Sequence, residues 1–246
     1  PSLFTSQDPR YCELARSLKA PELWSHPFGF DKQGCDIYSR VIYGARASVS
    51  VGVLTTIAVV IIGGTIGAIA GYARLDDSLL SRITDVFFAI PLLLAAIVFM
   101  QMFKESRSIA MVVVVLSTFA WTSIARITRG SVMSAKNEEF VTAARATGAS
   151  RGRILMSHII PNSMAPIIVY ATAHGTFIVS EASLSFMGIG LPPTIVSWGA
   201  DISQQGPAQR RTHGALLPAA ALALTVLSFI MMGDAVREAL HPKARK

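Results

Sequence analysis

The residues of this sequence that could do chemistry are few, and their spacing assembles no catalytic or metal site. The histidines lack the i, i+4 pairing by which one helix holds zinc. Ser180 and His174 have the wrong spacing to share a helix face as nucleophile and base. No Gly-x-x-x-x-Gly-Lys-Ser/Thr phosphate loop occurs, so ATP is expected to bind elsewhere. The chain is therefore predicted to be no enzyme and to hold no cofactor or metal of its own.

The two cysteines, Cys12 and Cys35, are too few for a disulfide framework. They could form a single bridge if both face an oxidising compartment. Two free thiols are the favoured expectation.

The composition indicates a membrane protein. Of the 246 residues, 52% are hydrophobic and only 15% are charged, and the mean hydropathy is +0.49. A soluble domain carries about 25% charged residues. A soluble enzyme, a disordered chain and a nucleic-acid binder are therefore excluded. The net charge of +7 fits basic loops beside a membrane.

Five apolar stretches are long enough to cross a bilayer as helices, and a barrel is excluded because none alternates in polarity. The expected fold is an all-α integral membrane protein, with Pro91 breaking the second span. In the first span Gly63, Gly67 and Gly71 have the small-xxx-small spacing that lets another helix approach closely, although glycine is also simply common in membrane helices. The five spans are Ser48–Tyr72, Val86–Phe103, Ile109–Ala125, Pro161–Val179 and Ala215–Gly233.

Basic residues near the span ends predict a cytoplasmic C-terminus, since they gather on the inner side of a membrane. Residues 1–46 would then be an extracytoplasmic segment leading into the membrane domain 47–246, and 181–214 an extracytoplasmic loop. No signal peptide precedes the segment, so a sixth span is expected upstream. Twelve basic residues lie on the predicted inner side (Arg74, Arg82, Arg126, Arg129, Lys136, Arg145, Arg151, Arg153, Arg237, Lys243, Arg245, Lys246) against seven outside (Lys32, Arg40, Arg46, Lys104, Arg107, Arg210, Arg211).

The longest predicted cytoplasmic loop, 126–160, reads as two short helices separated by a glycine. Asn137 is expected to cap a helix over 138–147 that stops at Gly148, a typical C′ residue. Ser150 is expected to cap a second helix over 151–160, which Pro161 joins to the fourth span. Small residues beside an apolar Phe140 suit docking into a groove of a partner protein, or equally a surface helix that packs on its own bundle.

This loop resembles the EAA loop of ATP-binding-cassette importer membrane subunits. The likeness lies in Glu139-Phe-Val-Thr-Ala143-Ala144-Arg-Ala-Thr-Gly148 and in His158-Ile-Ile-Pro161-Asn162. Two further stretches, 26–46 and 181–199, and the ending from Met232 resemble dipeptide and oligopeptide permeases. The chain is thereby identified as similar to their second membrane subunit, of OppC/DppC type.

That resemblance implies a type I importer-like helical bundle in a bacterial inner membrane, forming a peptide path with a sister permease subunit as a heterodimer. It also implies ATPase subunits, which hold ATP and magnesium, and an extracytoplasmic peptide-binding protein. The residues implied to contact the ATPase are Glu139, Phe140, Ala143, Ala144, Gly148, Ala149 and Pro161.

Three alternatives remain. Nickel and glutathione importers share the same architecture. An ion-coupled secondary transporter is less favoured, because no Asp, Glu, Lys or Arg lies in the middle of a predicted span.

Overall fold

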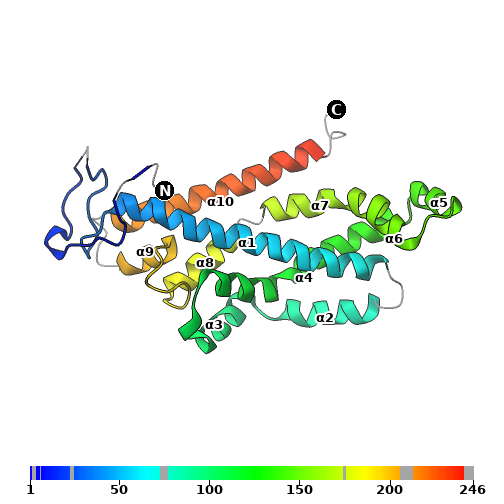
Figure 1. Ribbon diagram of the computed structural model, residues 1–246, viewed down its shortest axis with the longest axis horizontal. Coiled ribbons are helices and arrows are strands. Elements are labelled where there is room, and N and C mark those ends of the chain that lie inside the picture. The colour runs from blue at the N-terminus through cyan, green and yellow to red at the C-terminus, as the bar shows by residue number, and fades with distance from the viewer. Residues whose placement is uncertain are drawn as a thin grey trace. The chain divides into compact units, whose positions relative to one another are not determined.

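The computed structural model describes residues 1, 4–5, 7–22, 25–72, 77–173, 176–205 and 213–240, and within them every regular element is helical (Figure 1). Seven residues named above lie outside these ranges: Arg74, His174, Arg210, Arg211, Lys243, Arg245 and Lys246. The α-helices are α1 (Ile37–Tyr72), α2 (Asp77–Ala89), α3 (Leu92–Met102), α4 (Ile109–Ala135), α5 (Glu139–Ala146), α6 (Arg151–Ile154), α7 (Ile160–Ala173), α8 (Thr176–Phe186), α9 (Trp198–Gln205) and α10 (His213–Leu240).

The predicted spans are confirmed, and their number is approximately five. Among the described residues, four helical stretches are long and apolar enough to cross a membrane: Ile37–Tyr72, Ile109–Ala135, Arg151–Phe186 and Gly214–Leu240. A fifth is the bent pair formed by the end of α2 and by α3, which meet at 78°. Pro91 stands at that bend, because proline lacks the N–H of a helix interior and pushes the preceding residue out of the α region.

The chain forms two compact units. The first unit contains Pro1–Leu54, Ala96–Val115 and Gly175–Ser228. The second contains Thr55–Ala95, Leu116–His174 and Phe229–Lys246. The helices α1, α3, α4 and α10 contribute residues to both units.

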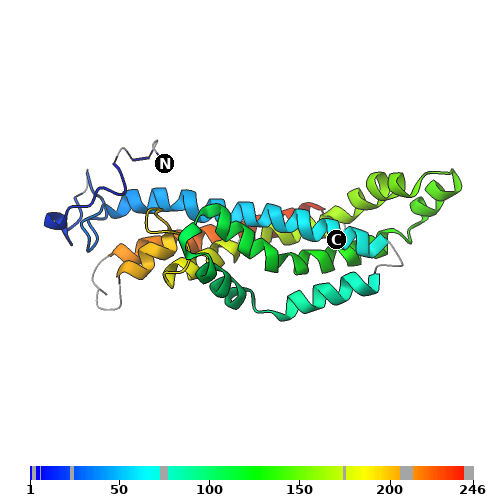
Figure 2. The same cartoon turned by 60° about the horizontal axis from the view of Figure 1, so that its bottom comes forward.

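In the second unit, α1 and α4 run side by side at very short range (Figures 1 and 2). A Cβ atom added to Gly63 would lie 2.4 Å from the carbonyl oxygen of Trp121, and one added to Gly67 would lie 2.4 Å from that of Ala125. The small-xxx-small prediction is therefore confirmed, since only residues without a side chain allow the two backbones to approach this closely.

The third predicted span was too short, because α4 continues past Ala125 to Ala135. Arg126 and Arg129 lower the hydropathy there without ending the helix. The Arg126 guanidinium donates to Asp85 at 2.7 Å and lies 3.9 Å from the ring centre of Phe88, both on α2. Figure 2 shows α2 running beside α4, so this basic stretch of helix has a packed neighbour.

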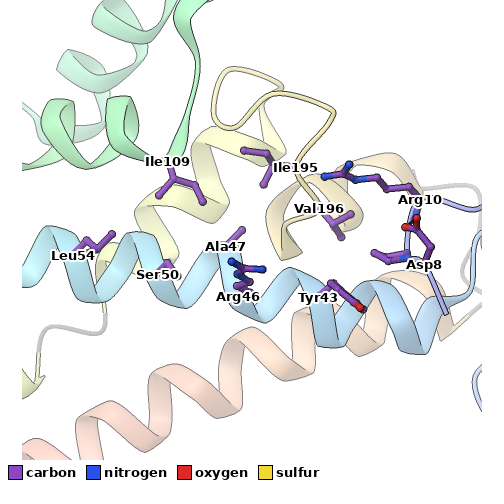
Figure 3. Close-up of a pocket in the computed structure, with 11 residues that line it drawn as sticks. Asp8, Arg10, Tyr43, Arg46, Ala47, Ser50, Leu54, Ile109, Ile195 and Val196 are labelled. Carbon is purple, nitrogen blue, oxygen red and sulfur yellow. Dashed lines mark hydrogen bonds between the residues drawn. The ribbon is translucent and has the colours of Figure 1, made fainter. Parts of the chain in front are cut away.

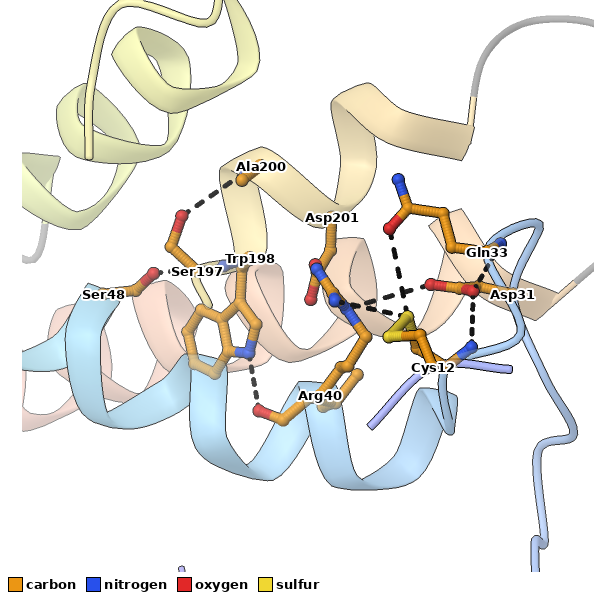
Figure 4. Close-up of polar contacts among 11 residues, drawn as sticks. Cys12, Asp31, Gln33, Arg40, Ser48, Ser197, Trp198, Ala200 and Asp201 are labelled. Atoms are coloured by element: carbon orange, nitrogen blue, oxygen red, sulfur yellow. Dashed lines mark hydrogen bonds and ion pairs between the residues drawn. A yellow bond between two sulfur atoms is a disulfide. The ribbon is translucent and has the colours of Figure 1, made fainter. Parts of the chain in front are cut away.

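The favoured expectation of two free thiols was wrong, because Cys12 and Cys35 form a disulfide in the first unit (Figure 4). A turn brings the cysteines together. The Asp31 carboxylate accepts the backbone N–H of Cys35 at 2.9 Å, and the Glu13 N–H donates to the carbonyl of Gly34 at 3.2 Å. The disulfide and the contact between Glu13 and Gly34 join positions more than twenty residues apart, which periodicity in a sequence does not reveal.

Next to the disulfide, Arg40 of α1 is paired with Asp201 of α9 (Figure 4). Its Nε donates to Asp201 at 2.9 Å, and Asp31 lies 3.9 Å away. Burial raises the pKa of the Asp201 carboxyl above its ordinary value of 3.8, and the Arg40 guanidinium opposes that shift. Trp198, also on α9, donates its indole N–H to the Val41 carbonyl at 2.9 Å, so α9 is fixed on the first turns of α1.

Glu181 follows the fourth predicted span, and it is buried within α8 with 0% of its surface exposed. It accepts a hydrogen bond of 2.7 Å from the Ser185 hydroxyl. The same hydroxyl accepts the Leu191 N–H at 3.2 Å. Glu181 therefore orders the segment after α8 through Ser185 rather than by direct capping.

Candidate functional site

In the loop between α4 and α7, the first short helix, α5, begins one residue later than expected. Glu138, not Asn137, is the N-cap residue of α5. The Asn137 side chain instead donates to the Met133 carbonyl at 3.1 Å. Its amide thus satisfies an acceptor in the last turn of α4, and this contact removes it from the capping position.

The end of α5 confirms the prediction for Gly148, whose φ is +79°. The Gly148 N–H donates to the Arg145 carbonyl at 3.0 Å, and the Ala149 N–H donates to the Ala144 carbonyl at 3.1 Å. These two bonds define the Schellman motif, which needs a residue in the left-handed region at C′. Gly148 therefore sets the direction in which the chain leaves α5.

The second short helix begins as predicted but does not stop at Pro161. The Ser150 hydroxyl accepts the Arg153 N–H at 3.4 Å and caps α6. A π-helical turn, η3 (Leu155–Ile159), then connects α6 directly to α7, in which Pro161 is the second residue. A wider turn before a proline relieves the clash of its ring with the carbonyl four residues earlier.

The inner face of this loop packs on the ends of α1 and α4. Val141 and Ala144 of α5 join Ile154 and Ile159 in one buried cluster, together with residues from the two long helices: Ala68, Val132 and Ala135. Two polar contacts add to it. The Tyr72 hydroxyl donates to the Arg151 carbonyl at 3.1 Å, and the Lys136 ammonium donates to the Gly71 carbonyl at 2.7 Å. The loop is therefore held in place by its own chain.

The seven residues singled out in this loop divide between the two faces. Ala144 is 9% exposed within the buried cluster, and Ala149 is partly buried against it. The other five lie on the surface: Glu139, Phe140, Ala143, Gly148 and Pro161. The two possibilities left open by the sequence thus apply to different faces of α5, one packed on its own bundle and one available to a partner.

A groove of about 530 Å³ lies beside this outer face. Phe140, which is 38% exposed, borders it together with Glu138. The sequence offered no signal for the groove, because its walls come from three separate helices. Its other lining residues are Gly130, Ser131, Ser134, Ala135, Asn162 and Pro166.

Sequence reasoning also missed two residues that anchor the loop. In the sequence, Tyr72 marks only the end of the first predicted span, and Lys136 is only one of the basic residues on the predicted inner side. Both stand at helix ends beside the loop, and polar tips at such positions are the signal that could have identified them. Across the described ranges, no three His, Cys, Asp or Glu residues gather as a metal site.

Replacing Gly148 with Ala is expected to destabilise the α5 end by about 1–2 kcal/mol, the cost of the left-handed conformation for an ordinary residue. A Cβ atom there would meet nothing within 4 Å, so strain in the backbone is the only cause. Gly148→Asn should be milder, since asparagine tolerates this conformation. Faster hydrogen exchange of the α5 amides measures the effect.

Gly152→Ala is the matched control for this substitution. Gly152 also has open space around an added Cβ, but its φ is not positive. Equal exchange rates in Gly148→Ala and Gly152→Ala would contradict the strain argument.

Comparisons with known proteins agree on one family. Residues 44–246 match the family described as binding-protein-dependent transport system inner membrane component. The chain is 38% identical over 246 residues to the dipeptide transport system permease protein DppC of Alkalihalophilus pseudofirmus, covering 99% of this chain and 80% of that protein. It is 35% identical over 247 residues to the oligopeptide transport system permease protein OppC of Bacillus subtilis, with the same coverage, 99% and 80%.

A third relative and one solved structure complete the comparison. The glutathione transport system permease protein GsiD of Escherichia coli is 40% identical over 227 residues, which are 89% of this chain and 73% of that protein. The inward-facing MetNI methionine ABC transporter superposes with a TM-score of 0.69 at 18% identity, covering 82% of this chain and 97% of that one. At that identity the likeness establishes the shared fold.

Proposed function

Because the chain belongs to the family of binding-protein-dependent transport system inner membrane components, we propose that it forms the peptide path of an ATP-driven importer together with a sister permease subunit. The chain is itself a permease subunit of the ABC importer class. The proposal that the transported molecules are peptides rests on the match along 99% of the chain to dipeptide and oligopeptide permeases. Glutathione, itself a short peptide, is the second candidate, favoured by 40% identity over 227 residues.

We propose further that the outer face of α5 is where ATPase subunits act on this chain. Its support is mechanical: the inner face is packed on α1 and α4 through the buried cluster, so a push on α5 moves both long helices. Phe140 offers an apolar contact at the border of a groove whose lining is part polar and part apolar, and a partner helix could occupy that groove. ATP and magnesium would be held by the partner, since this sequence has no phosphate loop.

The disulfide supports the proposed orientation. Disulfides persist in oxidising compartments and are rare in the cytosol. The bond between Cys12 and Cys35 lies in residues 1–46, the segment expected outside the membrane. The loop at α5 and the C-terminus would then be cytoplasmic, in a multi-pass protein of the bacterial inner membrane. The partner on the outer side would be a peptide-binding protein.

Reconstitution into vesicles tests the proposed function. The chain with its sister permease, its ATPase subunits and its external binding protein is expected to accumulate a labelled dipeptide when ATP is supplied. The chain alone should neither accumulate peptide nor hydrolyse ATP. Accumulation of glutathione but of no other peptide would favour the second candidate. Uptake of nickel ions without peptide, or ATP hydrolysis by the chain alone, would contradict the proposal.

A further inference from the structure

A pocket of about 680 Å³ lies within the first unit, apart from the loop at α5 (Figure 3). One wall is a single face of α1, because its five lining positions follow the i, i+3, i+4, i+7 spacing of a helix. The opposite wall combines the N-terminal segment, the start of α4 and the loop before α9. From α1 come Tyr43, Arg46, Ala47, Ser50 and Leu54, and from the other elements Asp8, Pro9, Arg10, Ile109, Ile195 and Val196.

The polarity of this pocket changes along α1. Tyr43 and Arg46 lie toward the helix start, where Asp8 lies beside Tyr43 and Arg10 extends from the opposite wall (Figure 3). Leu54 lies two turns further on, and Ile109 lies on the same side, so this end is apolar (Figure 3). The ligand that fits such a pocket has a charged group at one end and an apolar body at the other.

Two arginines give the charged end its sign. Within the described residues, neither the Arg10 nor the Arg46 guanidinium has a hydrogen-bond or ion-pair partner. Arg40, one and a half turns before Arg46 on the same helix, is instead paired with Asp201. Asp8 is the one carboxylate in the lining, and its oxygen accepts the Arg10 backbone N–H at 2.9 Å. Two cations and one anion leave a net positive charge.

We propose that this pocket binds the C-terminal carboxylate of a short peptide, with Arg46 and Arg10 on the carboxylate and the last side chain along Ser50 and Leu54. The inference rests on the proposed function, because it takes a peptide as the transported molecule. Guanidinium groups match the geometry of a carboxylate. Ligand pockets span about 300–1,000 Å³, which suits a di- or tripeptide. A lipid phosphate would offer the same sign of charge to the two arginines, and the second measurement below distinguishes it from a peptide.

The test compares a hydrophobic dipeptide with its C-terminal amide in the reconstituted importer. In the unsubstituted importer the KM of the acid should be about tenfold lower than that of the amide. Arg46→Gln and Arg10→Gln should each raise the KM of the acid several-fold and leave that of the amide unchanged. All preparations contain the same binding protein, so its own preference cancels in the comparison. Lys104→Gln is the matched control, because Lys104 is an exposed cation outside the pocket.

A second measurement tests the inference even if a variant fails to assemble or the amide is not transported. Benzoylphenylalanine placed at Ser50 should capture a labelled dipeptide on illumination, and unlabelled acid should compete better than unlabelled amide. Normal uptake with equal KM changes for acid and amide, or capture suppressed by phosphatidylglycerol but not by peptide acid, overturns the inference alone. Absence of any peptide uptake by the unsubstituted importer overturns the proposed function and the inference with it.

Discussion

Tryptophan in place of Ala143 is expected to abolish peptide uptake while the protein still reaches the membrane. Ala143 is exposed and lies on the side of α5 opposite Val141 and Ala144, which pack on the loop's own cluster. An indole there would fill the space of a partner without disturbing that cluster. Peptide uptake and pull-down of the ATPase subunits should both fall to background.

The matched control is Ala143→Ser, which keeps the small size and should leave uptake near normal. Ala144→Trp is a poor test, although the sequence suggests it, because Ala144 is buried and the substitution would unfold the loop itself. Normal uptake and normal ATPase pull-down by Ala143→Trp would mean that this face of α5 contacts no partner.

Leucine in place of Gly67 is expected to prevent folding of the second unit. An added Cβ atom would lie 2.4 Å from the carbonyl oxygen of Ala125 and 2.8 Å from the Cβ of Thr128. Both obstacles belong to the backbone or to an atom fixed to it, so neither can rotate away. The α1–α4 contact would have to open, and no folded protein should be recovered from detergent extracts.

Gly64→Leu is the control for this substitution, since an added Cβ atom at Gly64 meets nothing within 4 Å. It should give a normal elution profile and thermal midpoint. Both variants lose a glycine from the same helix, so the loss of flexibility cancels. Recovery of folded Gly67→Leu at the level of Gly64→Leu would show that the close approach of the two helices is not required.

The features that the sequence predicts well are local ones. Pro91 breaks its span, Ser150 caps α6 and Gly148 ends α5, because each effect depends on the backbone chemistry of one residue and its near neighbours. The glycine spacing in α1 also predicts a close helix contact, although not that α4 is the partner.

The features that the sequence misses depend on contacts between distant positions or on pairing of charges. Hydropathy locates the apolar part of a helix but not its end, so α4 continues through Arg126, whose charge is matched by Asp85. Burial of Glu181 requires the Ser185 hydroxyl at its side, and the bond between Cys12 and Cys35 requires the turn at Asp31. None of these pairings follows from composition or period.

The most direct test of the coupling proposal is photo-cross-linking from the outer face of α5 in the assembled importer. Benzoylphenylalanine in place of Phe140 should yield a covalent product with an ATPase subunit on illumination. The same probe in place of Met102, which is 69% exposed at the end of α3, should not. An importer that takes up peptide normally, yet gives no ATPase product from position 140 or an equal amount from position 102, would contradict the account.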